Sequence, residues 1–517
     1  MAALGKNLLR RPLLACLIAG LLPVLVRLLL LPVIPVPVPK DHDEFSYLLG
    51  ADTFAHGRLT NPPHPMWVHF EAPHVIQQPT YSSKYFPAQA LFLAFGQRLF
   101  GHPWAGVVLS IGVMCACLCW MLQGWVSPGF ALLAASLAAL GWGVTDYWMN
   151  SYWGGAVPAL FGALVIGAVP RLVGNASAPA ALLGVIGAVG LANCRPFEGG
   201  LTVLSAAAVF FVLARRDRLD FKLLVRRRVI LPAAGLIVAA AAFMAYYDYQ
   251  ATGNPLLPPY LLYERQYGPL PHFFLLPPTP KPVYRDELFS KLWDWENSLY
   301  LAAKSDPLTG VKFVWPLMAN LFVLNAIGVA ALLGVIFGKK SVTVPALGII
   351  ALPLAGVLAQ KAFLPHYLAP FCGAYLLIAA AGLEACGRWR IGRRRTGHFA
   401  VALLAGTGLG IFLLMVLNSA HAAQQKPTGI AERPLIIREL LQQGGKHLVI
   451  VRYSPTHFIH EDWVYNQADI DGSPIVWAKD KGQEEDQRLI QYFRDRRVWL
   501  LEPDRDPLAL RSFVPGS

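Results

Sequence analysis

Long apolar runs alternate with short polar segments through about the first 420 of the 517 residues. A helix needs about 20 predominantly apolar residues to cross the hydrocarbon core of a membrane. We therefore predict about eleven transmembrane helices, and this odd number places the two chain ends on opposite sides. The apolar runs cover approximately residues 12–34, 104–124, 128–146, 154–172, 179–193, 198–214, 229–247, 313–337, 342–360, 366–386 and 398–419.

The pattern changes after about Gln424, where the chain is no longer membrane-like. One later segment, 486–496, has helical spacing. We predict a fold of two parts, an α-helical polytopic membrane domain over residues 1–423 and a small C-terminal α/β domain over 424–517. The segments that look like short strands are 447–453, 462–466, 474–479 and 497–503.

Clusters of basic residues predict the orientation, because Lys and Arg collect in the cytoplasmic loops of membrane proteins. The clusters precede the first predicted helix and follow the sixth, eighth and tenth, which puts all of them on one side. We expect a cytoplasmic N-terminus, an extracytoplasmic C-terminal domain and a bacterial inner (cell) membrane location. The clusters are Lys6, Arg10 and Arg11; Arg215, Arg216, Arg218, Lys222, Arg226, Arg227 and Arg228; Lys339 and Lys340; and Arg388, Arg390, Arg393, Arg394 and Arg395.

Composition supports the membrane assignment, with 55% hydrophobic and only 15% charged residues, against about a quarter charged in soluble domains. The net charge of +13 lies in short clusters between apolar runs, so we expect no nucleic-acid partner. Six of the seven cysteines lie in or at the ends of apolar runs, so no disulfide framework is expected.

The polar loop between the first two apolar runs, residues 35–87, is far longer than a connection requires. We call it the first outer loop and predict that it covers an active site at the membrane surface. A second outer loop is expected at 248–312. Within the first, Asp41-His42-Asp43-Glu44 begins a short predicted helix. A capping box of Asp41 and Glu44 explains one or two of these acids, and Asp43 and Glu44 are the candidate catalytic residues.

Further candidates in the first outer loop are Glu71, Lys84, Tyr47 and Tyr85. Glu71 is either a rim carboxylate that binds a sugar hydroxyl or a solvated loop acid. Lys84 could bind lipid headgroups in general or one specific phosphate. Aromatic side chains such as Tyr47 and Tyr85 could hold a ring-shaped ligand.

Cationic residues at the outer ends of later helices should have anionic partners, because charge is costly near the hydrocarbon. For Arg195, Glu198 is available three residues on. Lys361, which is followed by His366 and Tyr367, has no acid nearby in the sequence, and this favours a phosphate ligand.

Five histidines of the first outer loop raise the alternative of a zinc site. Their spacing is irregular and no H-x-x-x-H helix is present, so we predict no cofactor; a divalent metal is possible but not required. The histidines are His42, His56, His64, His69 and His74.

With these residues set out, about the first 420 residues resemble the GT-C class of membrane glycosyltransferases, closest to the aminoarabinose-transferase and protein O-mannosyltransferase relatives. The matching positions are Asp43-Glu44, Tyr47, Gly57, Pro62-Pro63, Phe70-Glu71-Ala72-Pro73, Leu99-Phe100-Gly101, Trp104 and His366-Tyr367-Leu368-Ala369-Pro370. The chain departs from the aminoarabinose transferases at Ala72, where those usually have a lysine.

The resemblance implies an inverting transfer of a sugar from a polyprenyl-phosphate donor to a lipid, glycan or protein hydroxyl on the extracytoplasmic face. Asp43 would be the catalytic base and Glu71 a second carboxylate. Lys84, Arg195, Lys361 and His366 would be candidates for holding the donor phosphate.

A transporter or flippase of a lipid-linked sugar is the alternative, with the acids coupling proton movement. Transporters usually carry ionisable residues at mid-membrane and show internal repeats. Here the acids lie in an outer loop and Arg27 is the only charge well inside a predicted helix, which favours an enzyme.

Overall fold

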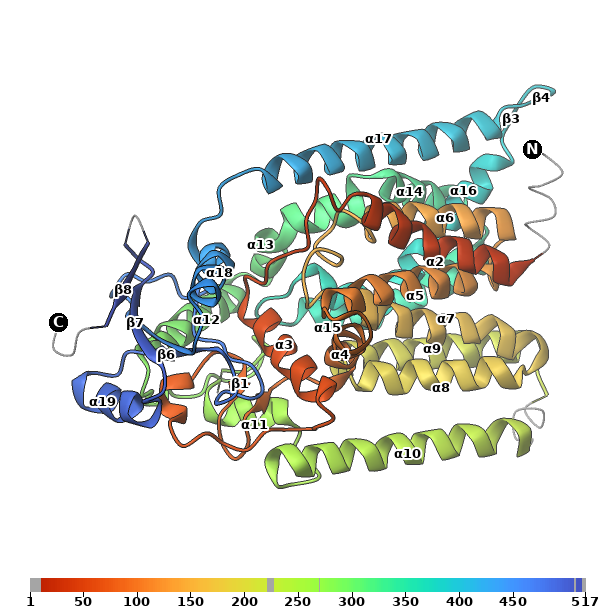
Figure 1. Ribbon diagram of the computed structural model, residues 1–517. Coiled ribbons are helices and arrows are strands. Elements are labelled where there is room, and N and C mark those ends of the chain that lie inside the picture. The colour runs from red at the N-terminus through yellow and green to blue at the C-terminus, as the bar shows by residue number, and fades with distance from the viewer. Residues whose placement is uncertain (1–10, 221–226, 269, 506–507, 514–517) are drawn as a thin grey trace.

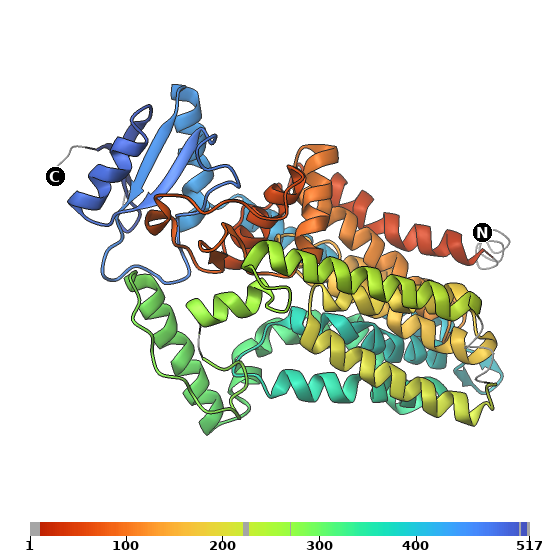
Figure 2. The ribbon, with the colours of Figure 1, turned by 90° about the horizontal axis from the view of Figure 1, so that it is seen from below.

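A bundle of long helices occupies one end of the molecule, and the outer loops and a β-sheet occupy the other (Figures 1 and 2). The computed structural model describes residues 11–220, 227–268, 270–505 and 508–513. Of the predicted basic clusters, Lys6, Arg10, Lys222 and Arg226 lie outside the described residues.

Each predicted apolar run contains a helix. Of the helices among the described residues, eight are long and apolar enough to cross a membrane, and the pair α13 and α14, bent by 77°, would be a ninth. The helices are α2 (Pro12–Leu29), α5 (Trp104–Gln123), α6 (Pro128–Gly141), α7 (Ala156–Asn175), α8 (Ala178–Ala192), α9 (Pro196–Arg216), α10 (Arg227–Thr252), α13 (Thr309–Met318), α14 (Ala326–Phe337), α15 (Lys340–Leu358), α16 (Cys372–Gly387) and α17 (Gly397–Ala423).

The prediction of about eleven full-length spans is therefore too high. The helices α6 and α8 contain only 14 and 15 residues. At 1.5 Å per residue they extend roughly 21–23 Å, short of the roughly 30 Å hydrocarbon core. In the third run the helix ends at Gly141, because the rest of the run is a loop whose apolar residues Trp142 and Val144 are fully buried.

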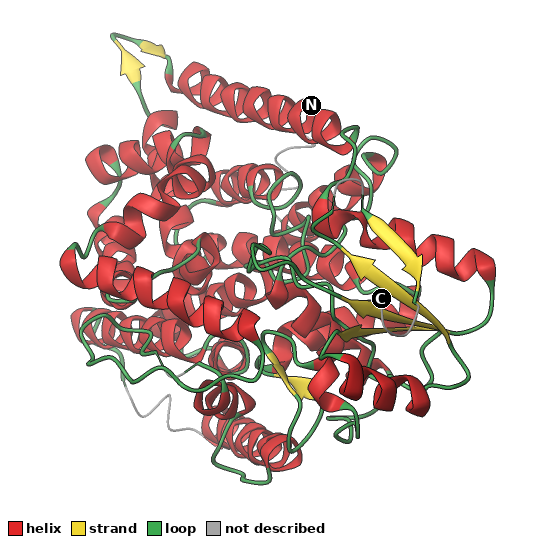
Figure 3. Ribbon diagram, turned by 90° about the vertical axis from the view of Figure 1, so that its left-hand side faces the viewer, coloured by secondary structure: helices red, strands yellow, loops and turns green. Residues whose placement is uncertain are grey.

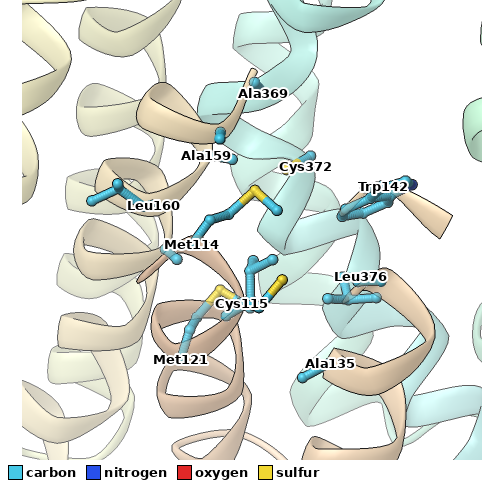
Figure 4. Packing of buried hydrophobic residues seen from close by; sticks show 14 of the residues in the cluster. Met114, Cys115, Met121, Ala135, Trp142, Ala159, Leu160, Ala369, Cys372 and Leu376 are labelled. Carbon is cyan, nitrogen blue, oxygen red and sulfur yellow. The ribbon is translucent and has the colours of Figure 1, made fainter. Parts of the chain in front are cut away.

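Close packing in the bundle fixes the segments that carry candidate site residues. The 3₁₀ helix η4 (Pro365–Phe371) lies against α7, where a Cβ on Gly162 would come within 1.8 Å of the Pro370 carbonyl oxygen. Figure 4 shows Met114 and Cys115 between the helices that carry Leu160 and Leu376. All seven cysteines are free, which confirms that no disulfide framework is present.

Arg27, the charge predicted inside the first span, is fully buried and holds the chain where α2 ends. Its guanidinium donates to the carbonyl oxygens of Ile34 and Pro35, each at 2.8 Å, and to Asn150 Oδ1 at 3.1 Å. The Arg27 guanidinium therefore provides hydrogen bonds for backbone carbonyl groups at the start of the first outer loop.

The two outer loops form short elements between the bundle and the sheet (Figure 1). The first outer loop contributes a helix that is buried along most of its length, a 3₁₀ turn and a small antiparallel ladder, and the second contributes two helices. These elements are α3 (His42–Ala55), η1 (Trp67–Phe70), β1 (Val75–Ile76) and β2 (Ser82–Ser83), followed by α4 (Pro87–Phe100), and then α11 (Pro259–Gln266) and α12 (Glu287–Ser305).

The C-terminal region is an α/β unit with a four-stranded sheet in the order β6-β5-β7-β8 (Figure 3). The central strand β5 runs parallel to β6 and β7, with Val449 opposite both Trp477 and Trp499, and β8 is antiparallel to β7. The elements are α18 (Arg433–Gln443), β5 (His447–Val451), β6 (Ile475–Lys479), α19 (Gln483–Tyr492), β7 (Arg497–Glu502) and β8 (Ala509–Ser512).

Three of the four predicted strands are confirmed. The prediction of a strand over 462–466 is wrong, because this segment pairs with no other strand. Trp463 in that segment is fully buried, so its apolar pattern reflects packing on the sheet. The predicted helix 486–496 begins earlier and ends at Tyr492.

Candidate functional site

The first turn of α3 is fixed by Glu44, whose carboxylate accepts backbone N–H groups on both oxygens. Oε2 accepts from Lys40 at 2.7 Å and from Asp41, the N-cap, at 3.0 Å, which is the Glu half of a capping box. Oε1 accepts from the Tyr152 N–H at 3.0 Å. Glu44 is 3% exposed, and burial raises its pKa to about 7. We therefore interpret Glu44, which the sequence suggested as catalytic beside Asp43, as a residue that positions the turn.

Asp43 lies on the same turn but contacts side chains instead of backbone. The Tyr85 hydroxyl donates to Asp43 Oδ1, and the ring of Tyr85 stacks on Tyr47 with centroids 4.4 Å apart. His74 Nε2 lies 3.9 Å from Asp43 Oδ2, beyond hydrogen-bonding distance, and 26% of the Asp43 side chain is exposed. Oδ2 is thus the carboxylate oxygen available to a substrate hydroxyl.

Burial raises the pKa of Asp43, while the Tyr85 hydrogen bond and the positive charges of Lys84 and Arg195 oppose the increase. A carboxylate whose pKa is raised by burial is a stronger base than one in water, and the nearby cations favour its ionised form. This combination suits a carboxylate that acts as a general base.

Lys84 is enclosed by aromatic rings and one acid. Its Nζ lies 4.6 Å from the centroid of Tyr263 and 5.0 Å from that of Tyr260, and Glu264 Oε1 is 3.5 Å away. The side chain is 7% exposed. Lys84 is therefore a buried cation that α11 covers, and its charge is partly offset by Glu264.

Arg195 stacks on the ring of Tyr367, with its guanidinium carbon 4.1 Å from the ring centroid. Within the described residues no carboxylate forms an ion pair with Arg195. Glu198, the partner considered from the sequence, accepts a hydrogen bond from Gln360 Nε2 at 3.0 Å instead. Arg195 is thus a cation at the start of a membrane helix that makes no direct ion pair among the described residues, although the charges of Glu198 and Asp43 act on it. A cation without a direct partner suits an anionic ligand.

Lys361 differs, because the second outer loop supplies an acid that is distant in sequence. Its Nζ lies 2.7 Å from Glu296 Oε2, and the side chain is 8% exposed. Lys361 was a candidate for binding phosphate because no acid lies near it in the sequence. That reason is wrong, because Glu296 pairs with it in the folded chain. His366 is 1% exposed, its Nδ1 shares a hydrogen bond of 3.1 Å with the Tyr147 hydroxyl, and its ring contacts that of Trp153.

Glu71 is 4% exposed, so the interpretation as a solvated loop acid is wrong. The Tyr267 hydroxyl donates to its Oε1 at 3.1 Å, and no described residue hydrogen-bonds its Oε2. Burial raises its pKa, while the charge of Lys481 opposes the increase. Its charged neighbours are Lys479, Lys481 and Asp286, so it belongs to the contact with the C-terminal region and not to the surroundings of Asp43.

The five loop histidines do not gather at one point, although the rings of His42 and His74 lie 5.9 Å apart. Three of them contact the C-terminal region: His42 shares a hydrogen bond with the Tyr465 hydroxyl, His64 with Asp471, and His69 with the Lys479 carbonyl. No three His, Cys, Asp or Glu side chains of the described residues are arranged to hold a metal ion.

His74 is the site residue that sequence reasoning did not separate from the other histidines. Its backbone adopts a left-handed φ of 65°, rare for a non-glycine residue. The Tyr263 hydroxyl accepts from its N–H at 2.9 Å, and its carbonyl accepts from Ser46 and Lys84. These contacts orient the His74 ring towards Asp43. No local sequence pattern predicts them.

The chain path is similar to that of several solved membrane proteins. ArnT from Cupriavidus metallidurans matches in its apo state with a TM-score of 0.47 and 14% identity, over 93% of this chain and 92% of that chain. ArnT bound to undecaprenyl phosphate matches with a TM-score of 0.48, 14% identity and the same coverage. The Archaeoglobus fulgidus oligosaccharyltransferase in complex with Zn and sulfate matches with a TM-score of 0.45 and 12% identity, over 94% of this chain and 67% of that chain.

No protein-family model and no curated protein sequence matches the chain. At 12 to 14% identity the similarities carry no residue-by-residue correspondence with the site.

Proposed function

We propose that this protein is an inverting glycosyltransferase that moves a sugar from a polyprenyl-phosphate donor to a lipid, glycan or protein hydroxyl at the extracytoplasmic membrane surface. One observation carries the proposal: Asp43, a partly buried carboxylate with one oxygen free of hydrogen bonds, is influenced by two cations, Lys84 in the first outer loop and Arg195 at the start of a membrane helix. A base and a phosphate-binding cation at the edge of a bilayer suit a lipid-linked donor.

In this mechanism Asp43 Oδ2 accepts the proton of the acceptor hydroxyl while the hydroxyl oxygen attacks the anomeric carbon. Tyr85 holds the other carboxylate oxygen and so fixes the direction of Oδ2. General-base assistance of this kind typically contributes roughly 10²–10⁴-fold to a rate. The attack is direct, so the new bond forms on the face opposite the leaving group and the anomeric configuration inverts.

The bond between the anomeric carbon and the phosphate oxygen breaks as the new bond forms, and the departing polyprenyl phosphate gains negative charge. Arg195, held against Tyr367 with no described carboxylate paired to it, is the cation best placed to stabilise that charge. Lys84 adds to the positive field. A single phosphate needs less neutralisation than a pyrophosphate, so the proposal includes no metal cofactor.

The test is a transfer assay with the protein in nanodiscs, polyprenyl-phosphate sugars as donors, and lipid, glycan and peptide acceptors. We expect transfer to a hydroxyl and, by NMR of the product, an inverted anomeric centre. Retention of configuration, or transfer from soluble nucleotide sugars but not from the lipid donors, would contradict the proposal.

A further inference from the structure

A cavity of about 330 Å³ lies beside the first turn of α3 and is separate from the contacts of Asp43. Asp41 and Glu44 form one wall and loop 142–155 forms another, and Asp43 is not among the lining residues. The volume falls within the range of pockets that hold small organic ligands. None of the residues contributed by loop 142–155 was a candidate from the sequence.

One polar group in the cavity lacks a partner. Ser151 is 6% exposed, and its Oγ makes no hydrogen bond within the described part of the chain. Next to it, the Asn150 amide is fixed by donation to the Val144 and Asp146 carbonyls, both at 2.9 Å. A buried hydroxyl without a partner is unfavourable unless a ligand or water satisfies it, so this wall is suited to hydrogen-bonding an occupant.

Aromatic side chains form another part of the lining. Tyr147 and Trp153 have ring centroids 6.2 Å apart, inclined by 55°, and both contact His366. The Tyr147 hydroxyl hydrogen bond to His366 fixes its ring. Fixed aromatic faces beside the Ser151 hydroxyl and the Asp41 carboxylate are a combination that suits sugar rings, which present C–H faces and a rim of hydroxyls.

The charges of the cavity argue against a phosphate. Its acids are Asp41 and Glu44, and its cation, Lys40, is exposed to solvent. Arg195 and Lys84, the cations near Asp43, are not among the lining residues. Apolar side chains, including Leu317, which is 51% exposed, complete the lining and suit a ligand that carries a lipid chain.

We propose that this cavity binds the sugar ring of the acceptor, a membrane-borne saccharide whose bound ring carries no phosphate. The assignment rests on the proposed function and adds the chemical class of the second substrate. Asp41 lines the cavity and lies two positions before Asp43, so the cavity adjoins the turn of α3 that carries the proposed base.

The test measures binding without turnover, with the protein in nanodiscs free of sugar-headed detergent. Hexyl β-D-glucopyranoside is the probe, and hexyl phosphate and 1-hexanol are the comparison ligands. Saturation-transfer NMR should show contact to the ring protons of the glucoside, and hexanol should not displace it. Trp153→Leu should weaken binding about three- to tenfold, the loss expected for one aromatic contact, and Ser151→Leu should block the cavity.

Trp389→Leu, at the exposed hairpin end of the bundle, is the matched control and should leave binding unchanged. Equal binding to wild type, Trp153→Leu and Ser151→Leu proteins with unchanged thermal midpoints would overturn the proposal, as would stronger binding of hexyl phosphate. Asp43→Asn should retain glucoside binding. If glucoside binding fails these tests while sugar transfer proceeds, the cavity assignment is wrong and the proposed function stands. If the glucoside binds specifically but no sugar is transferred, the result counts against the proposed function.

Discussion

The carboxylate of Asp43 faces two side chains that are distant from it in sequence. Tyr85, 42 positions later, donates to one oxygen, and His74 approaches the other to 3.9 Å. Sequence reasoning selected Asp43 and Tyr85 because acids and aromatics gathered in one loop. It did not predict their pairing, because the contact depends on how α3 packs against the β1–β2 ladder.

Replacing Tyr85 with Phe should shift the pH dependence of transfer. Asp43 must be ionised to accept a proton, and burial raises its pKa above the ordinary value of about 3.9. Activity should therefore fall, as pH is lowered, at a higher pH than an exposed Asp would give. Because the Tyr85 hydroxyl lowers the pKa of Asp43, Tyr85→Phe should raise it further and move the acid limb of kcat/KM to higher pH.

The control for that profile is Tyr492→Phe, which removes a similar tyrosine–carboxylate bond, 3.2 Å long, to Asp471 at the surface. It should leave the acid limb unchanged. An acid limb that stays in place in Tyr85→Phe would show that Asp43 does not set the pH dependence.

His74→Gln should lower kcat about ten- to a hundredfold, up to the lower end of the roughly 10²–10⁴-fold general acid–base contributions, with little change in KM. A hydroxyl bound to Asp43 Oδ2 lies within reach of His74 Nε2, given the 3.9 Å between the two atoms. His56→Gln is the matched control, since His56 Nδ1 is 3.4 Å from Asp52 but 61% exposed. Equal kcat values for the two variants would exclude a role for His74 in the reaction.

The helix α3 shows which element-level features could be predicted and which could not. The Asp-x-x-Glu spacing predicted the helix start and the Glu44 cap, both of which are present. The third bond of Glu44, to the Tyr152 N–H, comes from a loop more than a hundred residues away. For the same reason Glu296 could not be predicted as the partner of Lys361, because pairing between α12 and the segment that follows α15 depends on tertiary structure.

Glu44→Gln should destabilise the protein without moving the acid limb of the pH profile. The amide replaces one acceptor oxygen with a donor that faces a backbone N–H, and loss of such a bond costs about 1–3 kcal/mol. Thermal unfolding in detergent should show a lower midpoint. Glu287→Gln, 73% exposed at the start of α12, should not change the midpoint. A stable Glu44→Gln protein with a displaced acid limb would instead support a catalytic Glu44.

At the scale of the whole molecule, the C-terminal region packs on the first outer loop. Phe45, Leu49 and Phe70 share a buried cluster with the sheet. The Asp52 carboxylate accepts from the Ala468 N–H at 2.8 Å, and the Tyr81 hydroxyl donates to the Asn466 carbonyl at 3.0 Å. The sequence predicted the two parts and their order but not this shared core, because isolated apolar residues in a polar loop do not reveal what covers them.

Removal of residues 424–517 should expose this cluster and abolish activity, even though Asp43 is retained. We expect limited proteolysis to cut the truncated protein within the first outer loop, while the intact chain resists. As a control, a protease site inserted after Gln425 and cleaved in the folded protein should leave the fragments associated and active. A truncated protein with a protected loop and full activity would show that the sheet does not support the site.

The most direct measurement of the central claim is the single-turnover rate of sugar transfer from a polyprenyl-phosphate donor by wild type and Asp43→Asn. An amide cannot accept the acceptor proton, so the rate should fall roughly 10²–10⁴-fold while donor binding persists. The exposed Asp294→Asn control should keep the wild-type rate. A wild-type rate in Asp43→Asn would contradict the account, because transfer would then proceed without the carboxylate on which it depends.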